Sequence, residues 1–303
     1  MAEEAERVAA PAEGTLGALA EAVAAVLLPV AGSDGDASRE ARELLAAMHD
    51  MPRHWVVVER GTAMTDADWV RALRAAERRA AGAPLQYAAG RASFRHLTLD
   101  VDERVLIPRP ETEQLVEIVL DATAEERGGI AVDVGTGSGA IALALASEGR
   151  FARVIGTDIS SDALDVARGN LTRCASSLRA PVELRGGSLL RPVLERPLRA
   201  VVSNPPYIST GEAGKLPASV RDWEPAVALF SGADGMSATA RLVRESAAAL
   251  GAGGLLALEV DARRASIAAE LVATHGEYEQ VRVLLDLTGR ERFVVARRRE
   301  GVE

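Results

Sequence analysis

The chain has 303 residues, a formal net charge of −9 and a hydrophobic content of 48%. This length allows one large domain or two smaller ones with a substantial core, and the net negative charge argues against a broad nucleic-acid-binding surface. Cys174 is the only cysteine, which excludes internal disulfides and zinc sites built from several cysteines. The four histidines have no metal-ligand spacing.

No targeting or membrane segment is predicted. The first ten residues, MAEEAERVAA, are acidic and lack the basic stretch that opens a secretory signal peptide. The mostly apolar run at 18–30 is too short to cross a bilayer, and Glu21 interrupts it. We therefore expect a cytoplasmic protein with no membrane partner.

Three amphipathic helical patterns occupy the first part of the chain. Two cover about 15–30 and 37–49, and the third follows Thr65, which suits the N-cap position with Asp68 three residues later. No catalytic cluster accompanies these helices. Residues 1–83 are therefore predicted to form a small helical domain, which either contributes packing alone or, as we expect, binds the protein substrate.

The pattern changes over residues 84–107. The stretch ASFRHLTLDVDERVLI alternates apolar and polar residues, which predicts a β-hairpin with its turn at Asp102 and Glu103. This hairpin is expected to link the helical domain to a second domain at 108–303. A helix is predicted over 108–120, because Pro110 suits a first helical position.

Beyond residue 128 the chain alternates strictly between strands and helices. The predicted strands are IAVDV, RVIGTD, VELRGG, RAVVSN, GLLALEV and two late ones at 281–285 and 292–295. Helical patterns separate the first strands, whereas the turn sequence DLTGRE joins the last two and leaves no room for a helix. The fold class is therefore α/β, a doubly wound and mostly parallel sheet with a terminal antiparallel strand.

A glycine loop, DVGTGSGA at 133–140, follows the first of these strands. Gly135, Gly137 and Gly139 allow a sharp turn and the close approach of a ligand. Asp158, at the end of the next strand, is expected to accept hydrogen bonds from two ribose hydroxyls. Nicotinamide dinucleotides and S-adenosylmethionine both contain this ribose, so the loop alone leaves the two cofactors open, and a Walker A loop is excluded because no lysine follows.

The stretch VVSNPPYI at 201–208 favours S-adenosylmethionine, because it lies in the crevice beside the glycine loop and no hydride-handling acid or base has a recognisable place. The nitrogen of an amide or aromatic NH2 group is a poor nucleophile, because its lone pair is delocalised. The Asn204 side-chain oxygen and the Pro205 backbone carbonyl can hold such a group by two hydrogen bonds. Tyr207 offers a flat surface for it.

Four stretches together resemble the PrmC/HemK-type protein-(glutamine-N5) methyltransferases, which modify the glutamine of the Gly-Gly-Gln motif in peptide chain release factors. They are LIPRPETE, DVGTGSGAIALALA, VVSNPPYI and VRDWEPAVALFSGADGM. The resemblance extends over nearly the whole chain. It implies a small helical domain followed in the sequence by a class I methyltransferase domain. It also implies S-adenosylmethionine as methyl donor and release factors as protein partners. No specific nucleic-acid binding is expected.

The resemblance also implies roles for individual residues. The donor's methionine part is expected at Gly135, Thr136, Gly137, Ser138 and Gly139, and its ribose at Asp158. Asn204 should touch both donor and glutamine, and the glutamine pocket should be completed by Pro205, Pro206 and Tyr207. Arg109 and its flanking prolines are expected to form a wall near the site, or else only to begin a helix.

The sequence departs from the family at Ser188 and Leu189, where an acidic residue and a bulky one usually contact the adenine. Serine can still accept a hydrogen bond and leucine can still cover the adenine face. Three alternatives stay open: a glutamine methyltransferase for a ribosomal protein, an adenine methyltransferase for nucleic acid, and a cofactor-binding module without catalysis.

Overall fold

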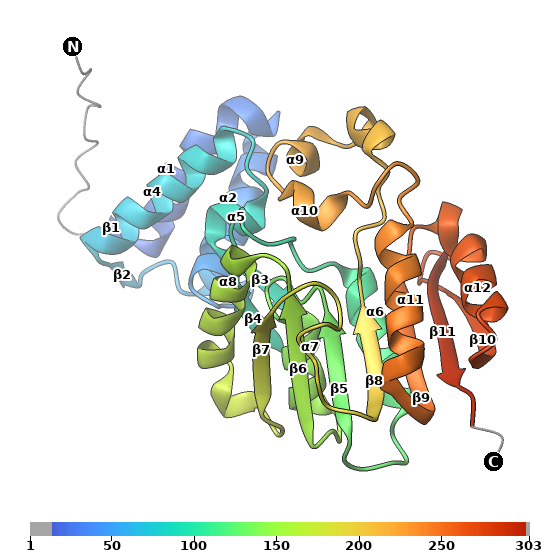
Figure 1. Cartoon of the computed structure of the whole chain (residues 1–303). Helices are drawn as coiled ribbons and strands as arrows, with labels where there is room; N and C mark the ends of the chain where they lie inside the picture. Colours follow the sequence, from blue (N-terminus) through green and yellow to red (C-terminus); the bar gives the residue numbers. More distant parts are fainter. Residues whose placement is uncertain (1–13, 301–303) are drawn as a thin grey trace. The chain divides into compact units, whose positions relative to one another are not determined.

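The computed structural model describes residues 14–300, and the chain divides into two compact units between Arg91 and Ala92 (Figure 1). The acidic first ten residues, on which the prediction about a signal peptide rests, lie outside the described part. Over residues 14–300, no helix has both the length and the apolar character needed to cross a membrane.

The first unit consists mainly of helices. They are α1 (Leu16–Ala31), α2 (Asp34–Met48), α3 (Trp55–Val58), α4 (Asp66–Ala80) and α5 (Leu85–Ala89), and β1 (Gly14–Thr15) pairs antiparallel with β2 (Ala63–Met64). The three predicted helices are confirmed as α1, α2 and α4. Their apolar faces form one core, in which Leu16, Leu44 and Leu45 have no exposed surface.

Helix α4 begins with the capping interaction that its sequence indicates. The Asp68 backbone N–H donates to Thr65 Oγ1 at 3.2 Å, and the Thr65 backbone N–H donates to Asp68 Oδ2 at 3.1 Å. Both groups would otherwise lack an intrahelical partner, so the reciprocal bonds fix the first turn.

The predicted hairpin exists, but its predicted turn is wrong. Strands β3 (Arg91–Phe94) and β4 (Leu97–Asp100) pair, and Arg95 and His96 connect them, with Arg95 at a φ of +52°. Asp102 instead forms a separate turn after the hairpin, where its Oδ1 accepts the Arg104 backbone N–H at 3.0 Å. Asp102 therefore has turn chemistry as predicted, but no strand follows it to make a hairpin.

The second unit is built on a seven-stranded sheet in the order β10-β11-β9-β8-β5-β6-β7. Its strands are β5 (Ile130–Val134), β6 (Arg153–Asp158), β7 (Val182–Gly186), β8 (Leu198–Ser203), β9 (Leu250–Glu259), β10 (Tyr278–Leu285) and β11 (Glu291–Arg298). Strands β5 to β9 run parallel, whereas β11 is antiparallel to both of its neighbours. The predicted fold class is confirmed.

Helices cover both faces of this sheet (Figure 1). On one face lie α6 (Pro110–Ala122), α7 (Ala140–Glu148) and α8 (Ser161–Arg173); on the other lie α11 (Ser237–Ala249) and α12 (Ala265–Thr274). The segments between these strands and helices contain five short helices, namely η1 (Ala175–Ser177), η2 (Thr210–Lys215), α9 (Ala218–Arg221), α10 (Ala226–Leu229) and η3 (Ala262–Arg264). Because both faces are covered, the central strands β5 and β8 are largely apolar and buried, whereas the outer strands β7 and β10 carry polar residues.

The topology creates a crevice at one edge of the sheet. Strand β5 lies at the centre, with β6 and β7 on one side and β8 and β9 on the other. The chain leaves β5 and β8 on the same edge, because the two strands are parallel. Ligands of open α/β sheets bind at such a reversal of strand order, outside the carboxyl ends of the strands.

The capping box of α4 gives a test of the first unit. Thr65→Ala removes the side-chain acceptor, so we expect the free energy of unfolding to fall by about 1 kcal/mol. Urea unfolding followed by circular dichroism measures this change. Thr172→Ala, at an exposed position late in α8, is the matched control and should have little effect. Equal losses in both variants would contradict the assigned cap.

Candidate active site

The glycine loop after β5 presents bare backbone to solvent. Gly135, Gly137 and Gly139 have φ angles of +75°, +54° and +86°, which side-chain-bearing residues rarely adopt. No atom lies within 4 Å of the place where a Cβ would stand at Gly135 or Gly137. The space in front of these two residues is therefore open to a ligand.

A buried carboxylate holds the loop from behind. Asp133 Oδ2 accepts hydrogen bonds from Thr136 Oγ1 at 2.6 Å and from the Ala142 backbone N–H at 3.1 Å. Complete burial raises the pKa of Asp133 to about 7. The side chains of Thr136 and Ser138 are buried as well, so they shape the loop from behind.

Asp158 connects the loop to the end of β6. Its Oδ2 accepts the Gly137 backbone N–H and its Oδ1 accepts the Ser160 backbone N–H, both at 2.9 Å. A carboxylate has about four acceptor positions, so each oxygen can accept one further hydrogen bond. Asp158 thus braces the loop and keeps acceptor capacity beside the open space.

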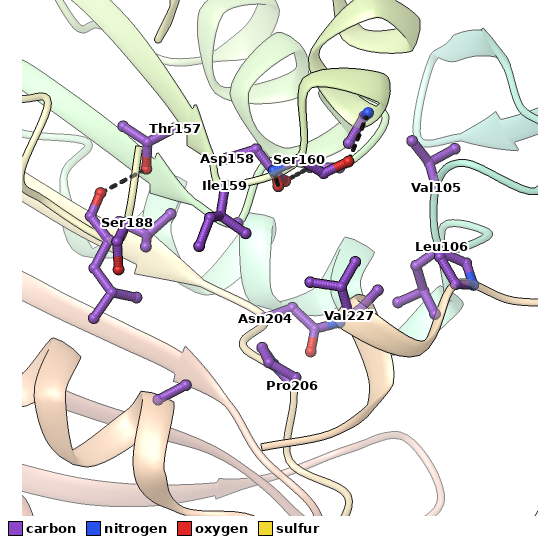
Figure 2. A pocket seen from close by; sticks show the side chains of 18 of the residues that line it. Val105, Leu106, Thr157, Asp158, Ile159, Ser160, Ser188, Asn204, Pro206 and Val227 are labelled. Carbon is purple, nitrogen blue, oxygen red and sulfur yellow. Dashed lines mark hydrogen bonds between the residues drawn. The ribbon is translucent and has the colours of Figure 1, made fainter. Parts of the chain in front are cut away.

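A cavity of about 240 Å³ lies in front of the loop (Figure 2). Among the predicted site residues, those that line it are Gly135, Gly137, Asp158, Ser188, Leu189, Asn204 and Pro206. The other walls are largely apolar and include Val105, Leu106, Ile159 and Val227. Thr136, Ser138 and Gly139 are not among the lining residues, although the sequence analysis groups them with the loop.

The two positions that depart from the family both lie at this cavity. Leu189 has a φ of +51°, and its carbonyl accepts a hydrogen bond from Thr157 Oγ1 at 2.9 Å. Ser188 Oγ accepts from Arg241 Nη2 at 3.2 Å, and Arg241 also lines the cavity. A serine–arginine pair thus stands where the resemblance leads us to expect an acidic residue.

A second cavity of about 100 Å³ adjoins the first. Its lining includes Arg109, Tyr207 and Glu224, and Asn204 and Leu106 line both cavities. Asn204 follows β8 directly. Because it lines both cavities, its side chain stands where they meet. Pro205 is buried and lines neither cavity.

An ion pair and burial determine the charges of the ionisable side chains in the second cavity. Arg109 Nη2 contacts Glu224 Oε1 at 2.5 Å, and the Glu224 side chain is 1% exposed. Burial raises the pKa of Glu224, and Arg109 opposes that shift. Burial, with the nearby charge of Glu259, raises the pKa of Tyr207 to about 12, so its phenol is neutral near pH 7.

Three polar side chains, those of Asn204, Thr112 and Glu259, form a chain of hydrogen bonds. Asn204 Nδ2 donates to Thr112 Oγ1 at 3.2 Å, and Thr112 Oγ1 donates to Glu259 Oε2 at 2.7 Å. Thr112 is 5% exposed and Glu259 is 2% exposed. Burial raises the pKa of Glu259 to about 7.

Thr112, Glu224 and Glu259 are not among the site residues predicted from the sequence. The sequence does contain a feature that indicates each of them as a candidate site residue. Thr112 and Glu224 lie inside LIPRPETE and VRDWEPAVALFSGADGM, two of the stretches that carry the resemblance. Glu259 is the one charged residue of the predicted strand GLLALEV and the last residue of β9, and a charged residue at the carboxyl end of a buried parallel strand is a candidate site residue.

Comparisons with known proteins show the family to which the chain is similar. Residues 20–90 match the PrmC N-terminal domain, and residues 111–218 match the methyltransferase small domain. A release factor glutamine methyltransferase of Moorella thermoacetica is 44% identical over 227 residues, which cover 75% of this chain and 79% of that protein. Another, of Deinococcus radiodurans, is 40% identical over 86% of this chain and 91% of that protein.

Among solved structures, the hMettl16 catalytic domain in complex with the MAT2A 3'UTR hairpin 6 aligns with a TM-score of 0.53. The two chains are 15% identical, and the alignment covers 80% of this chain and 86% of that one. At this identity the likeness shows the methyltransferase fold alone.

Asp133 makes the stability of the protein depend on pH. Its ordinary pKa is 3.8, so between about pH 4 and 7 the unfolded chain has released a proton that the folded chain retains. The contribution of Asp133 to stability therefore falls as the pH rises through this range. Asp133→Asn removes the titrating group, so we expect the stability of the wild type relative to this variant to fall from pH 4 to 7.

Urea unfolding of both proteins at several pH values measures this difference. Asp162→Asn, at an exposed position in α8, is the matched control and should follow the wild type. A constant difference between wild type and Asp133→Asn at all pH values would contradict the assignment.

Proposed function

Because the chain belongs to the release factor glutamine methyltransferase family, we propose that it methylates the side-chain amide nitrogen of the glutamine in the Gly-Gly-Gln motif of peptide chain release factors. The methyl donor of the family is S-adenosylmethionine. One observation carries the proposal. Asn204 lines both cavities, so a single side chain can contact a donor in the first and a glutamine in the second.

The residues of the first cavity suit this donor. Gly135 and Gly137 expose backbone where a Cβ would fill the space, Asp158 has acceptor capacity for the ribose hydroxyls, and Ile159 and Leu189 supply apolar walls for the adenine. When bound, the donor supplies a methyl group on a positively charged sulfur. In place of the usual acidic residue, Ser188 can accept or donate a hydrogen bond at the adenine edge.

Asn204 and Pro205 would orient the nitrogen that receives the methyl group. The amide nitrogen attacks well only when its lone pair leaves conjugation with the carbonyl. Two acceptors, Asn204 Oδ1 and the Pro205 carbonyl, can hold its two protons and favour the pyramidal geometry of attack. The consecutive prolines Pro205 and Pro206 fix φ and make the loop rigid, which restricts where the two acceptors can lie.

The second cavity suits the rest of a glutamine side chain. Tyr207 is neutral and offers a flat ring against which a planar amide can pack. Arg109 is held by the buried Glu224 and can donate to the carbonyl oxygen of the same amide. The predicted wall at Arg109 thus becomes an oriented donor in this proposal.

The partner and its compartment follow from the proposed substrate. Release factors act in translation, which places the reaction in the cytoplasm. The first unit matches the PrmC N-terminal domain, and we assign it to binding the release factor.

Asp158 gives a test of the donor site. Asp158→Ala removes the acceptor for the ribose and also the bond to the Gly137 backbone N–H. Hydrogen bonds to a charged group contribute about 1.5–3 kcal/mol, so the Kd for S-adenosylmethionine should rise about 10- to 100-fold. Isothermal titration calorimetry measures the Kd. Asp162→Ala loses the same charge from an exposed position and should bind normally; an unchanged Kd in Asp158→Ala would refute the assignment.

Mass spectrometry of a purified release factor, incubated with this protein and S-adenosylmethionine, tests the substrate. We expect one added methyl group on the glutamine of its Gly-Gly-Gln loop, and none when this glutamine is replaced by glutamate. Asn204→Ala should lower the rate by about 100-fold or more, because a positioned hydrogen-bonding group is lost, without changing the unfolding temperature.

Three results would overturn the proposal. Normal turnover by Asn204→Ala would exclude the mechanism. Methylation of a ribosomal protein or a nucleic acid, with no modification of the release factor, would exclude the substrate and support one of the alternatives left open by the sequence. Donor binding without transfer to any polymer would indicate a cofactor-binding module.

A further inference from the structure

We propose that Thr112 and Glu259 are positioning residues that fix the orientation of the Asn204 amide, so that its oxygen faces the cavities. The functional consequence rests on the proposed function, because it concerns the acceptor that holds the target glutamine. Neither residue lines either cavity, so both act through Asn204 and touch neither donor nor substrate.

The orientation of an asparagine amide is decided by its hydrogen-bond partners, because its oxygen and nitrogen have nearly the same shape. Thr112 has one hydroxyl proton. Glu259 Oε2 lies 2.7 Å from Thr112 Oγ1, and an ionised carboxylate can only accept hydrogen bonds. Thr112 therefore uses its hydroxyl proton to donate a hydrogen bond to Glu259. Thr112 Oγ1 can then only accept a hydrogen bond from Asn204.

Only the nitrogen of the Asn204 amide can donate that hydrogen bond. Asn204 Nδ2 therefore faces Thr112, at 3.2 Å, and Asn204 Oδ1 points the other way. This is the orientation that methyl transfer needs, because the oxygen must accept a proton of the target amide. The reversed amide would place a donor against that NH2 group and repel it.

The fold places the three residues together with little freedom. Ser203 and Leu258 are paired in the parallel register of β8 and β9, so Asn204 and Glu259 are the next residues along adjacent strands. Thr112 lies in the first turn of α6, at the same end of the sheet. Each group thus stands on, or directly after, a regular element, which favours precise positioning.

The arrangement requires Glu259 to be ionised. Burial, with the largest effect, and Glu111 oppose its charge, whereas the hydrogen bond from Thr112 and the charges of Arg292 and Arg109 stabilise it; Tyr207 nearby is neutral. Once protonated, Glu259 can donate to Thr112, and Thr112 can then donate to Asn204 Oδ1 and admit the reversed amide. The kcat at saturating donor should therefore fall as the pH drops below about 7, the pKa of Glu259.

Thr112→Val tests the proposal, because valine has a similar shape but no hydroxyl. A small misplacement at a reacting centre costs about 100-fold in rate, so we expect kcat to fall by about that factor while the Kd for S-adenosylmethionine changes less than threefold. Thr112→Ser restores the hydroxyl and should recover most of the rate. The dependence of kcat on Glu259 should be absent from the pH profile of Thr112→Val.

Thr123→Val is the matched control. Thr123 follows the same helix, is also 5% exposed, and its hydroxyl donates to the Val119 carbonyl at 2.8 Å, away from the site. This variant should keep the wild-type kcat. A Thr112→Val kcat within twofold of wild type, or a Thr112→Ser kcat as low as that of Thr112→Val, would overturn the proposal.

A measurement without substrate separates this proposal from the proposed function. In ¹⁵N nuclear magnetic resonance spectra, one Asn204 side-chain proton should exchange slowly in wild type and Thr112→Ser, and quickly in Thr112→Val. If this holds but no release factor is methylated, the substrate assignment fails and the positioning stands. Fast exchange in wild type would overturn the positioning, whatever the substrate.

Discussion

The parallel register of the central strands is the constraint on which the site depends. One row of paired residues crosses four adjacent strands: Thr157 of β6, Val134 of β5, Ser203 of β8 and Leu258 of β9. The residues that follow this row are the ones that the site uses: Asp158, Gly135, Asn204 and Glu259. Because neighbouring strands are about 4.8 Å apart, four positions that are distant in sequence lie side by side.

This row also explains the division of labour within the site. Asp158 and Gly135, on one side, face the cavity that suits the donor. Asn204 stands at the junction with the second cavity, and Glu259, beyond it, is buried. A slip of one residue in any strand would separate these groups, so the core on both faces of the sheet secures the site as well as the fold.

Two buried carboxylates, Asp133 and Glu259, lie directly behind the reacting space. Burial raises the pKa of each to about 7, so each is about half ionised at neutral pH, and its ionisation costs the folded chain stability. Each is bonded to a threonine hydroxyl, Thr136 or Thr112. Asp133 thereby holds the glycine loop, and Glu259 orients the residue that contacts the substrate. The cost in stability is offset by a site that is already arranged before ligands bind.

The sequence predicted those features that depend on local pattern. RVIGTD coincides with β6 residue for residue, and Thr65 and Asp68 form the expected cap, because alternation and capping are read from neighbouring residues. The hairpin turn was misplaced because Asp102 has the chemistry of a turn, and only tertiary pairing shows that no strand follows it.

The positions of Thr112 and Glu259 illustrate what the sequence does not contain. Each could be noticed as a polar residue at the end of an element. Their contact spans 147 residues of chain, and it follows from the strand order and from the placement of α6 on the sheet. Thr136 and Ser138 show the converse: the motif suggests that they face the donor, whereas the fold buries their side chains.

A crystal structure with S-adenosylhomocysteine and a peptide containing the Gly-Gly-Gln motif would test the central claim most directly. We expect the glutamine amide nitrogen to lie within hydrogen-bonding distance of Asn204 Oδ1 and of the Pro205 carbonyl. The sulfur of S-adenosylhomocysteine should lie on the other side of this nitrogen, in the first cavity. A glutamine side chain bound elsewhere, or an Asn204 amide whose nitrogen faces the glutamine, would contradict it.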